Sequence, residues 1–335
     1  MDARSLRLWT RPVSVTSSKE TTGTRTQRPL PVDDTVPALL SALECGNVVV
    51  VAPPGSGKTT RIPPALTGRV AVVEPRRIAA RMAASWVAQE RNQAVGAEVG
   101  YQVRFDARCG PQTRIRYVTD GVLTRRLLED PLLADVDAVV IDEFHERRLH
   151  TDVLLAWLRR LQLTTRPHLR LVVMSATIDP APLVAWLGGA AVVETSGRLY
   201  EVRVEHDDQP AERPLETRVA AVVRRVLDEA PQGDLLVFLP GAAEIRRAME
   251  ACAGLAASRG VDCLPLNGDL PLEQQAAAVQ VGPRRRIIFS TNVAESSVTV
   301  EGVTVVIDSG LVRRARTVPW SGLDEVRIEK ISRAS

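Results

Sequence analysis

The chain has 335 residues, with 43 basic and 40 acidic side chains and a hydrophobic content of 45%. No apolar run approaches the ~18–20 residues of a membrane span, and the four cysteines form no C-x-x-C pair, which argues against a zinc site or a disulfide framework. The length favours two domains. The cysteine usage favours a reducing, cytoplasmic setting with no membrane partner.

The N-terminal segment differs in charge from the rest of the chain. Residues 1–31 hold six basic and two acidic side chains, so they carry +4 of a net charge of +3 and leave the remainder at about −1. Any nucleic-acid contact must therefore come from a local groove. A segment rich in Ser, Thr and Arg is typical of a transit peptide or of a disordered tail, and we favour a disordered basic tail over residues 1–32.

From residue 33 onward, short apolar runs alternate with longer amphipathic segments. The apolar runs predict strands at residues 47–51, 70–74, 115–119, 138–142, 169–175 and 191–194. The segments between them predict helices at residues 77–93, 121–129, 149–161 and 180–187. This alternation predicts an α/β domain over residues 33–195, built on a doubly wound parallel sheet whose ligands bind at the carboxyl ends of the strands.

A polar, proline-bearing stretch at residues 207–214 interrupts this pattern, which then restarts. The second series predicts strands at 234–239, 261–266, 286–290 and 303–308, and helices at 242–257 and 272–281. Residues 199–205 alternate like a strand of the same unit. We therefore expect a second α/β domain of similar type over residues 196–335.

A glycine-rich run, APPGSGKTT, follows the first strand and opens a helix. Gly55 and Gly57 let several backbone N–H groups point at one anion, while Lys58 can reach the terminal phosphates and the Thr59 hydroxyl can hold Mg²⁺. Ala stands where this loop usually has its first glycine, and a plain strand–turn–helix connection is the alternative interpretation. The flanking strand and helix favour a nucleoside triphosphate site formed by Pro54, Gly55, Ser56, Gly57, Lys58, Thr59 and Thr60.

A second polar run, DEFHER, ends the apolar strand at residues 138–142. Asp142 is a hard carboxylate suited to phosphate-bound Mg²⁺, and Glu143 can orient and deprotonate an attacking water. Taken alone, the run could be a polar turn, but the phosphate loop favours the catalytic interpretation. The run from His145 to His150 is similar to a zinc-protease motif. The two histidines are five residues apart, however, and do not share one helix face, so we reject a zinc site.

Together these segments resemble the DEAH-type RNA helicases, and most closely the bacterial HrpB type, whose box also reads DEFH. Segments similar to the family's motifs Ia, Ib, III, IV and V lie at residues 74–81, 119–123, 175–177, 238–245 and 291–310. The resemblance covers about residues 33–335. It implies two tandem RecA-like P-loop domains, each a mainly parallel sheet flanked by helices, that use ATP or another NTP with Mg²⁺.

The resemblance also implies individual roles. RNA or another single-stranded nucleic acid would be held by its backbone, without base specificity, through Arg76, Arg77 and Thr119 in the first domain and Thr291 and Asn292 in the second. His145 would act with the catalytic group and link the Mg²⁺ site to the second domain. The nucleotide state would be coupled to the RNA by Ser175 and Thr177. Ser, Thr and Asn also favour helix caps, so these roles depend on the ordered set of motifs.

Two further expectations follow from the resemblance. Residues 316–331 would carry a β-hairpin used for strand separation. The family continues, after a run like residues 331–335, into motif VI, which supplies arginine fingers to the γ-phosphate. We therefore expect an incomplete second domain in a chain that binds Mg–NTP and hydrolyses it poorly, since such a finger can be worth ~10³–10⁵ in rate.

Two alternatives to a helicase stay open. One is a non-catalytic, nucleotide-gated RNA-binding or regulatory module, or an inactive gene fragment. The other is an unrelated P-loop ATPase, which the segments similar to motifs Ia, III and V oppose.

Overall fold

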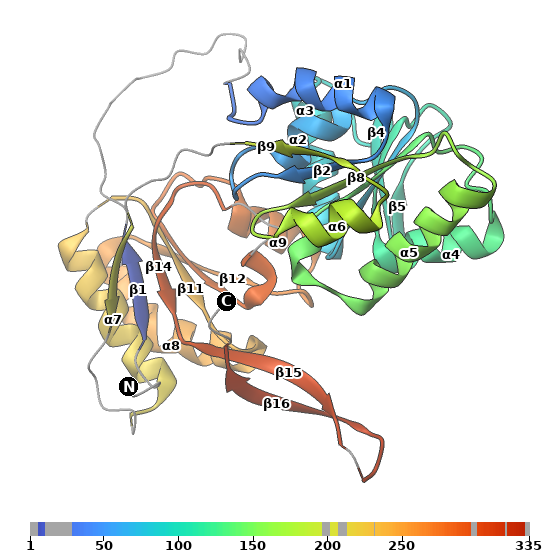
Figure 1. The fold of residues 1–335 in the computed structure, drawn as a ribbon. Helices are drawn as coiled ribbons and strands as arrows, with labels where there is room; N and C mark the ends of the chain where they lie inside the picture. The colour runs from blue at the N-terminus through green and yellow to red at the C-terminus, as the bar shows by residue number, and fades with distance from the viewer. Residues whose placement is uncertain are drawn as a thin grey trace. The chain divides into compact units, whose positions relative to one another are not determined.

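The computed structural model describes residues 6–10, 29–195, 202–206, 213–230, 232–295, 300–318 and 320–331. The chain divides into two compact units, each with a mainly parallel sheet flanked by helices (Figure 1). The first unit holds residues 29–195. The second unit holds the described residues from 202 onward together with residues 6–10. In the described part of the chain, no helix is long and apolar enough to cross a membrane.

The first unit has a sheet in the order β5-β4-β6-β3-β7-β8-β2-β9, in which only the β4–β5 pair is antiparallel. Its strands are β2 (Val48–Val51), β3 (Val70–Glu74), β4 (Val99–Val103), β5 (Asp106–Arg108), β6 (Ile115–Thr119), β7 (Ala138–Ile141), β8 (Arg170–Ser175) and β9 (Ala191–Glu194). Its helices are η1 (Asp33–Thr35), α1 (Val36–Cys45), α2 (Lys58–Ala65), α3 (Arg77–Glu90), α4 (Asp120–Glu129), η2 (Phe144–Glu146), α5 (Leu149–Thr164) and α6 (Pro180–Trp186).

Both faces of this sheet are buried. Successive side chains of a strand point to opposite faces, so Val48 and Val50 pack on the side of α1, α2 and α3, whereas Val49 packs on the side of α4, α5 and α6. Continuous apolar strands are what a parallel sheet covered on both faces requires. The polar residues at the strand ends are therefore held by a rigid, dry scaffold.

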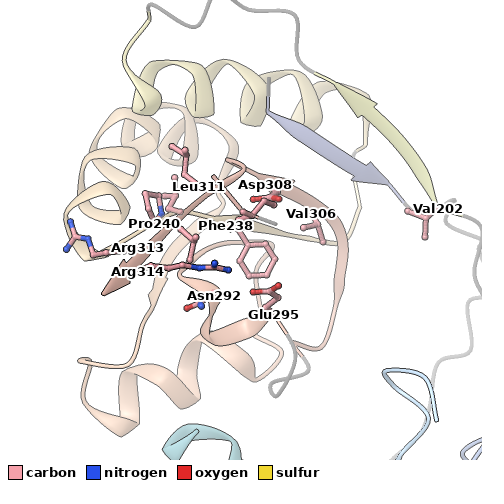
Figure 2. Close-up of a pocket in the computed structure, with 13 residues that line it drawn as sticks. Val202, Phe238, Pro240, Asn292, Glu295, Val306, Asp308, Leu311, Arg313 and Arg314 are labelled. Atoms are coloured by element: carbon pink, nitrogen blue, oxygen red, sulfur yellow. The ribbon is translucent and has the colours of Figure 1, made fainter. Parts of the chain in front are cut away.

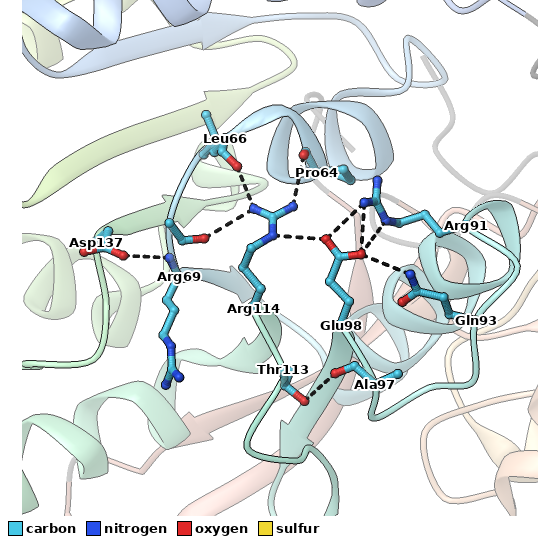
Figure 3. A network of polar contacts seen from close by, with 11 residues as sticks. Pro64, Leu66, Arg69, Arg91, Gln93, Ala97, Glu98, Thr113, Arg114 and Asp137 are labelled. Carbon is cyan, nitrogen blue, oxygen red and sulfur yellow. Dashed lines mark hydrogen bonds and ion pairs between the residues drawn. The ribbon is translucent and has the colours of Figure 1, made fainter.

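A polar network anchors the amino-terminal edge of this sheet, near the starts of β3, β4 and β6 (Figure 3). Glu98 accepts two hydrogen bonds of 3.0 Å from Arg91, one of 3.1 Å from Gln93 and one of 3.1 Å from Arg114. Arg114 also donates to the Leu66 carbonyl at 2.6 Å. Burial alone would raise the pKa of Glu98, but its arginine partners outweigh burial and lower it. These contacts fix the strands at the edge away from the phosphate loop.

The second unit has a sheet in the order β10-β1-β14-β11-β13-β12. Its strands are β1 (Arg7–Thr10), β10 (Arg203–His206), β11 (Asp234–Phe238), β12 (Asp262–Leu266), β13 (Arg286–Ser290) and β14 (Val303–Asp308), and a separate hairpin pairs β15 (Leu311–Thr317) with β16 (Asp324–Lys330). Its helices are α7 (Leu215–Glu229), α8 (Ala242–Arg259), α9 (Leu272–Val279) and η3 (Asn292–Ala294). Helices α7 and α8 pack on one face, against alternate residues of β11, β13 and β14.

The strand β1 corrects the prediction that all of residues 1–32 form a disordered tail. It pairs antiparallel with both β10 and β14, and the preceding Leu6 is 1% exposed in the core of the second unit. The composition of the segment concealed this strand, because a short apolar run lies within Arg, Ser and Thr, and its pairing partners lie roughly 200 to 300 residues away in sequence. Most of the predicted tail lies outside the described residues.

Other differences concern element boundaries. The hairpin begins at Leu311 rather than near residue 316, because the arginine-rich start of β15 lacks an apolar alternation. Strands β4 and β5 were not predicted, and neither were α1 and α7. The domain boundary near residue 195 falls at residues 196–201, which lie outside the described part of the chain.

Candidate active site

Five adjacent strands of the first unit carry polar residues or the phosphate loop to one edge of the sheet. In the spatial order β6-β3-β7-β8-β2, their carboxyl ends lead to Thr119, Glu74, Asp142, Ser175 and the phosphate loop. Parallel strands place these ends side by side. Residues from four separate segments of the sequence therefore lie along the same edge as the loop at residues 52–57.

The phosphate loop depends on two glycines in the left-handed region. Gly55 has φ +76° and Gly57 has φ +93°, which L side chains rarely adopt. A Cβ on Gly57 would also lie 2.6 Å from Leu30 Cδ1. Helix α2 begins at Lys58, directly after this turn, so its first backbone N–H groups and its dipole face the same space.

Two short contacts join the loop to the end of β7. Lys58 Nζ donates to Glu143 Oε1 at 2.8 Å, and both side chains are buried. Burial lowers the pKa of Lys58, but the charges of Asp142 and Glu143 outweigh burial and leave that pKa raised. The Thr59 hydroxyl donates to Asp142 Oδ2, while Asp142 Oδ1 accepts from the backbone N–H of Glu143 at 2.7 Å. The structure thus brings together the four residues that the sequence paired.

These residues fit a Mg²⁺-bound phosphate group. The Thr59 hydroxyl and the Asp142 carboxylate lie in contact, and the buried Ser56 Oγ has no hydrogen-bond partner in the structure. Within the described ranges, no cluster of three or more His, Cys, Asp or Glu could hold a metal alone. Mg²⁺ is usually held by one or two protein oxygens together with substrate phosphates and water, which is what Thr59 and Asp142 can provide.

Glu143 has the properties of a general base. It lies in the left-handed region at φ +51°, a conformation that costs free energy in a non-glycine residue. Burial and the charge of Asp142 raise the pKa of Glu143 to about 7, against the opposing effect of Lys58. A base whose pKa lies near neutrality can accept a proton from water and release it again.

His145 links this base to the end of the neighbouring strand β8. Its Nδ1 lies 3.3 Å from Glu143 Oε2 and accepts from the Ala176 backbone N–H at 3.5 Å. Burial and the charge of Lys58 lower the pKa of His145, so the neutral ring is favoured. Ser175 reaches the other side of the site, because its carbonyl accepts from the Ala52 N–H, the first residue of the phosphate loop, at 2.9 Å. Thr177 is exposed on the same turn.

One residue of the site was missed by the sequence analysis. Glu74 ends β3 and is 1% exposed, and its Oε1 has no hydrogen-bond partner in the structure. Burial, followed by the charges of Asp142 and Glu143, raises the pKa of Glu74 well above its ordinary value. The available signal was a carboxylate placed directly after the apolar run at residues 70–73. This residue lies in the segment similar to motif Ia, but no individual role was predicted for it.

The residues predicted to contact RNA fall into two groups. Arg76, Arg77 and Thr119 lie at the carboxyl ends of the adjacent strands β3 and β6, where Glu74 and Thr119 are paired in register. Arg76 Nη2 lies 3.3 Å from Glu146 Oε1, and Arg77 is exposed at the start of α3. Thr291 and Asn292 follow β13 in the second unit, and Asn292 is exposed. The neighbouring Ser296 and Ser297 lie outside the described residues.

The fold and the site together define a class: tandem RecA-like P-loop domains in which a phosphate loop faces an Asp-Glu pair. The family models agree with this class. The DEAD/DEAH box helicase model matches residues 33–184, and the helicase conserved C-terminal domain model matches residues 218–334. The chain therefore belongs to the DEAD/DEAH box helicases.

Individual relatives are similar over most of this chain. The chain is 40% identical to the ATP-dependent RNA helicase HrpB of Escherichia coli over 91% of its own length and 39% of that protein. It is 37% identical to the human ATP-dependent RNA helicase DHX33 over 92% of its length and 46% of that protein. The crystal structure of the E. coli DEAH/RHA helicase HrpB matches 91% of this chain and 40% of that chain, with a TM-score of 0.81 and 38% identity.

The chain thus spans about two fifths of the length of the relatives that it matches. The matched part contains both helicase domains.

Proposed function

We propose that this chain is the ATP-driven motor of an RNA helicase, which couples the binding and hydrolysis of Mg–ATP to movement on, or remodelling of, RNA. The observation that carries the proposal is the pair of contacts between the phosphate loop and the end of β7, Lys58 with Glu143 and Thr59 with Asp142. The relatives that share both domains are named as ATP-dependent RNA helicases, which supports the same function.

The chemistry follows from the positions of the side chains. The loop at residues 54–60 cradles the phosphates, and Lys58 exchanges its contact with Glu143 for the terminal phosphates. Thr59 and Asp142 would hold Mg²⁺, which when bound would supply positive charge beside the transferred phosphoryl group. Glu143, released from Lys58, orients the attacking water and accepts its proton. His145, whose Nδ1 lies 3.3 Å from Glu143 Oε2, borders this carboxylate and connects it to the end of β8.

RNA is proposed as the partner that this motor moves along. Arg76, Arg77 and Thr119 would contact the RNA backbone from the first unit, and Thr291 and Asn292 from the second. Contacts to phosphate and sugar carry no sequence information, so we expect binding that is nonspecific and strongly weakened by salt. Ser175 and Thr177 would transmit the nucleotide state. A cytoplasmic setting and the use of several NTPs belong to the same proposal.

Residues 1–335 alone are proposed to turn over slowly. An arginine that stabilises the transferred phosphoryl group can be worth ~10³–10⁵ in rate, and no residue of the proposed site is assigned that part. Nucleotide binding, in contrast, needs only the loop and Mg²⁺ ligands of the first unit.

Single-turnover hydrolysis of radiolabelled ATP tests the proposal. We expect a slow, Mg²⁺-dependent reaction that single-stranded RNA accelerates and that Glu143→Gln abolishes, whereas the exposed Glu129→Gln variant reacts like the wild type. RNA that binds without changing the hydrolysis rate would instead indicate a non-catalytic, nucleotide-gated module. A reaction that survives in Glu143→Gln would contradict the assigned base.

A further inference from the structure

The second unit contains a cavity that the proposed function does not use. Its volume is about 380 Å³, and it lies where the parallel strands β11, β13 and β14 end, beside the base of the hairpin β15–β16 (Figure 2). Ligands of parallel sheets bind at the carboxyl ends of strands. The cavity is lined by Val202, Phe238, Leu239, Pro240, Asn292, Glu295, Val306, Asp308, Leu311, Val312, Arg313, Arg314 and Ile331.

The inner part of the cavity is apolar and contains one aromatic ring. Phe238, at the end of β11, is half-buried and lies at the centre of the close-up (Figure 2). Val306 on β14 and Leu311 on β15 are also partly exposed within the lining. A flat, apolar face can therefore pack against Phe238 in this part of the cavity.

The rest of the lining carries positively charged, negatively charged and polar side chains. Arg313 is engaged by Glu244, with 3.6 Å between Nη2 and Oε2. For the side chain of Arg314, by contrast, no ion pair or hydrogen bond is found within the described residues, and its guanidinium points toward the ring of Phe238 (Figure 2). The carboxylates of Glu295 and Asp308 lie on two sides of the same ring (Figure 2).

This combination matches a nucleobase better than other common ligands. A base has two flat faces that stack on an aromatic ring and on a guanidinium plane. Its edge carries both donors and acceptors, which suit the carboxylates of Glu295 and Asp308 and the amide of Asn292. A free phosphate would be repelled by the two carboxylates, and an acyl chain would offer the polar groups of the lining no hydrogen bond.

We propose that this cavity binds one unpaired base of the nucleic acid, stacked on Phe238 and Arg314. The inference rests on the proposed RNA binding and adds a base contact to a path that otherwise touches only the backbone. Asn292 connects the two, because it lines the cavity and is also one of the expected backbone contacts. The base enters while its phosphates stay outside, near the exposed β15 arginines.

The test compares two single-stranded RNA oligomers of about ten nucleotides: one of mixed sequence, and one with the same phosphates and riboses but no bases. Fluorescence anisotropy with the full chain should show about tenfold tighter binding to the oligomer with bases, which is a typical effect of stacking one base. In Phe238→Leu, which keeps an apolar side chain but removes the ring, and in Arg314→Lys, which keeps the charge but not the plane, this preference should fall toward one. The exposed Trp186→Leu variant in the first unit should retain it.

The outcomes separate the two proposals. If wild type binds both oligomers equally well, or if both cavity variants keep the preference, the base site is wrong while RNA binding stands. If neither oligomer binds, the RNA partner of the proposed function is wrong as well, and so is the base site. Arg314 is exposed, so its variant remains informative even if Phe238→Leu reduces the folded fraction.

Discussion

Single residues of the phosphate loop hold the site in a conformation that only they allow. Gly57 has a left-handed φ of +93°, and a Cβ added to it would lie 2.6 Å from Leu30 Cδ1. Either property alone would disfavour a side chain, and Leu30 Cβ at 3.1 Å limits how far the leucine can yield. The loop is therefore intolerant of substitution at this position.

We predict that Gly57→Ala weakens ATP binding by at least about tenfold and costs about 1–2 kcal/mol in the free energy of unfolding, because an L residue pays that much in the left-handed region. Isothermal titration and urea unfolding measure the two effects. The control is Gly254→Ala within α8, where nothing lies within 4 Å of an added Cβ. That change should leave ATP binding intact and stabilise the helix by about 0.5–1 kcal/mol. Normal ATP affinity in Gly57→Ala would contradict the assigned cradle.

The buried carboxyls of Glu74 and Glu143 predict an unusual dependence of stability on pH. Both have folded-state pKa values above their ordinary value of 4.5, and that of Glu143 is about 7. Between pH 4.5 and the folded-state pKa, the folded protein binds more protons than the unfolded chain. The contribution of these carboxyls to the free energy of unfolding is therefore complete below about pH 4.5 and is lost as the pH rises through the folded-state pKa. For Glu143 the loss is about 3 kcal/mol at most.

Urea unfolding of the Mg²⁺-free protein should accordingly give a lower free energy at about pH 8 than at about pH 6. Glu74→Gln, whose amide does not titrate, should lose less between these two values than the wild type does. Comparing the two proteins removes the contribution of His145, whose lowered pKa acts in the opposite direction. An identical pH dependence in both proteins would show that Glu74 is ionised or solvated, against the structure.

The sequence predicted those residues whose chemistry depends on close spacing along the chain. Lys58 and Thr59 are adjacent, as are Asp142 and Glu143, and the structure brings the two pairs into contact. Glu74 was not predicted as a site residue, because its raised pKa comes from burial near Asp142, which follows the neighbouring strand β7. No local sequence pattern reveals this arrangement. The cavity at Phe238 was not predicted for the same reason, because its lining comes from several separate segments of the sequence.

Among the elements, β1 shows how a distant segment completes a sheet. It lies between β10 and β14, so β10 is joined to the rest of the sheet only through β1. Without it, β14 would present unpaired backbone groups, which favour aggregation. Leu6 anchors the strand by inserting into the core of the second unit.

Leu6→Ala is therefore predicted to destabilise the second unit by about 2–5 kcal/mol, the range for a buried leucine. The matched change Leu323→Ala, at a residue that is 70% exposed, should stay within about 0.5 kcal/mol. Urea unfolding followed by circular dichroism gives both values. Equal stability of the two variants would restore residues 6–10 to a disordered tail.

A buried ion pair joins the start of β11 to the start of β13 in the sheet of the second unit. Arg286 is 1% exposed and donates to Asp234 through Nε at 2.9 Å and Nη2 at 2.5 Å. Its backbone N–H also donates to Asp234 Oδ1 at 2.8 Å. Removing the aspartate would leave a buried guanidinium without its counter-ion.

For Asp234→Ala we expect a loss of about 3–5 kcal/mol in the free energy of unfolding, as for other broken buried pairs. Asp228→Ala breaks the exposed pair with Arg259 and should cost no more than about 1 kcal/mol. Differential scanning calorimetry should show the transition of the second unit moving to lower temperature in Asp234→Ala alone. A similar shift for both variants would mean that burial does not set the strength of the Arg286 contact.

Elements with an uninterrupted apolar pattern were predictable, and those built on mixed sequence were not. β3 and β6 have the predicted bounds, because every residue of Val70–Glu74 is buried and three of the five residues of Ile115–Thr119 are buried. β4 contains a glycine and a glutamine, and β5 is three residues long and largely exposed, so neither produced a strand signal. The arginine-rich β15 likewise forms a strand through pairing with β16 rather than through its own pattern.

At the scale of the whole molecule, two family models and two compact units agree on the organisation of the chain. The first unit supplies the whole nucleotide constellation, from the phosphate loop to Glu143, and the second contributes Thr291, Asn292 and the cavity at Phe238. Nucleotide binding is thus the property that one unit can provide by itself. The proposed RNA binding and remodelling would depend on both units.

Equilibrium titration with a fluorescent ATP analogue, with and without Mg²⁺, tests the central claim most directly. The chain has only three lysines, which allows a matched comparison of Lys58→Ala with the exposed Lys330→Ala. We predict Mg²⁺-dependent binding that Lys58→Ala weakens by at least about tenfold, since a buried charge contact to phosphate is lost, and that Lys330→Ala leaves unchanged. Equal affinity in the two variants, or no binding by the wild-type protein, would contradict the assignment of residues 54–60 as a nucleotide site.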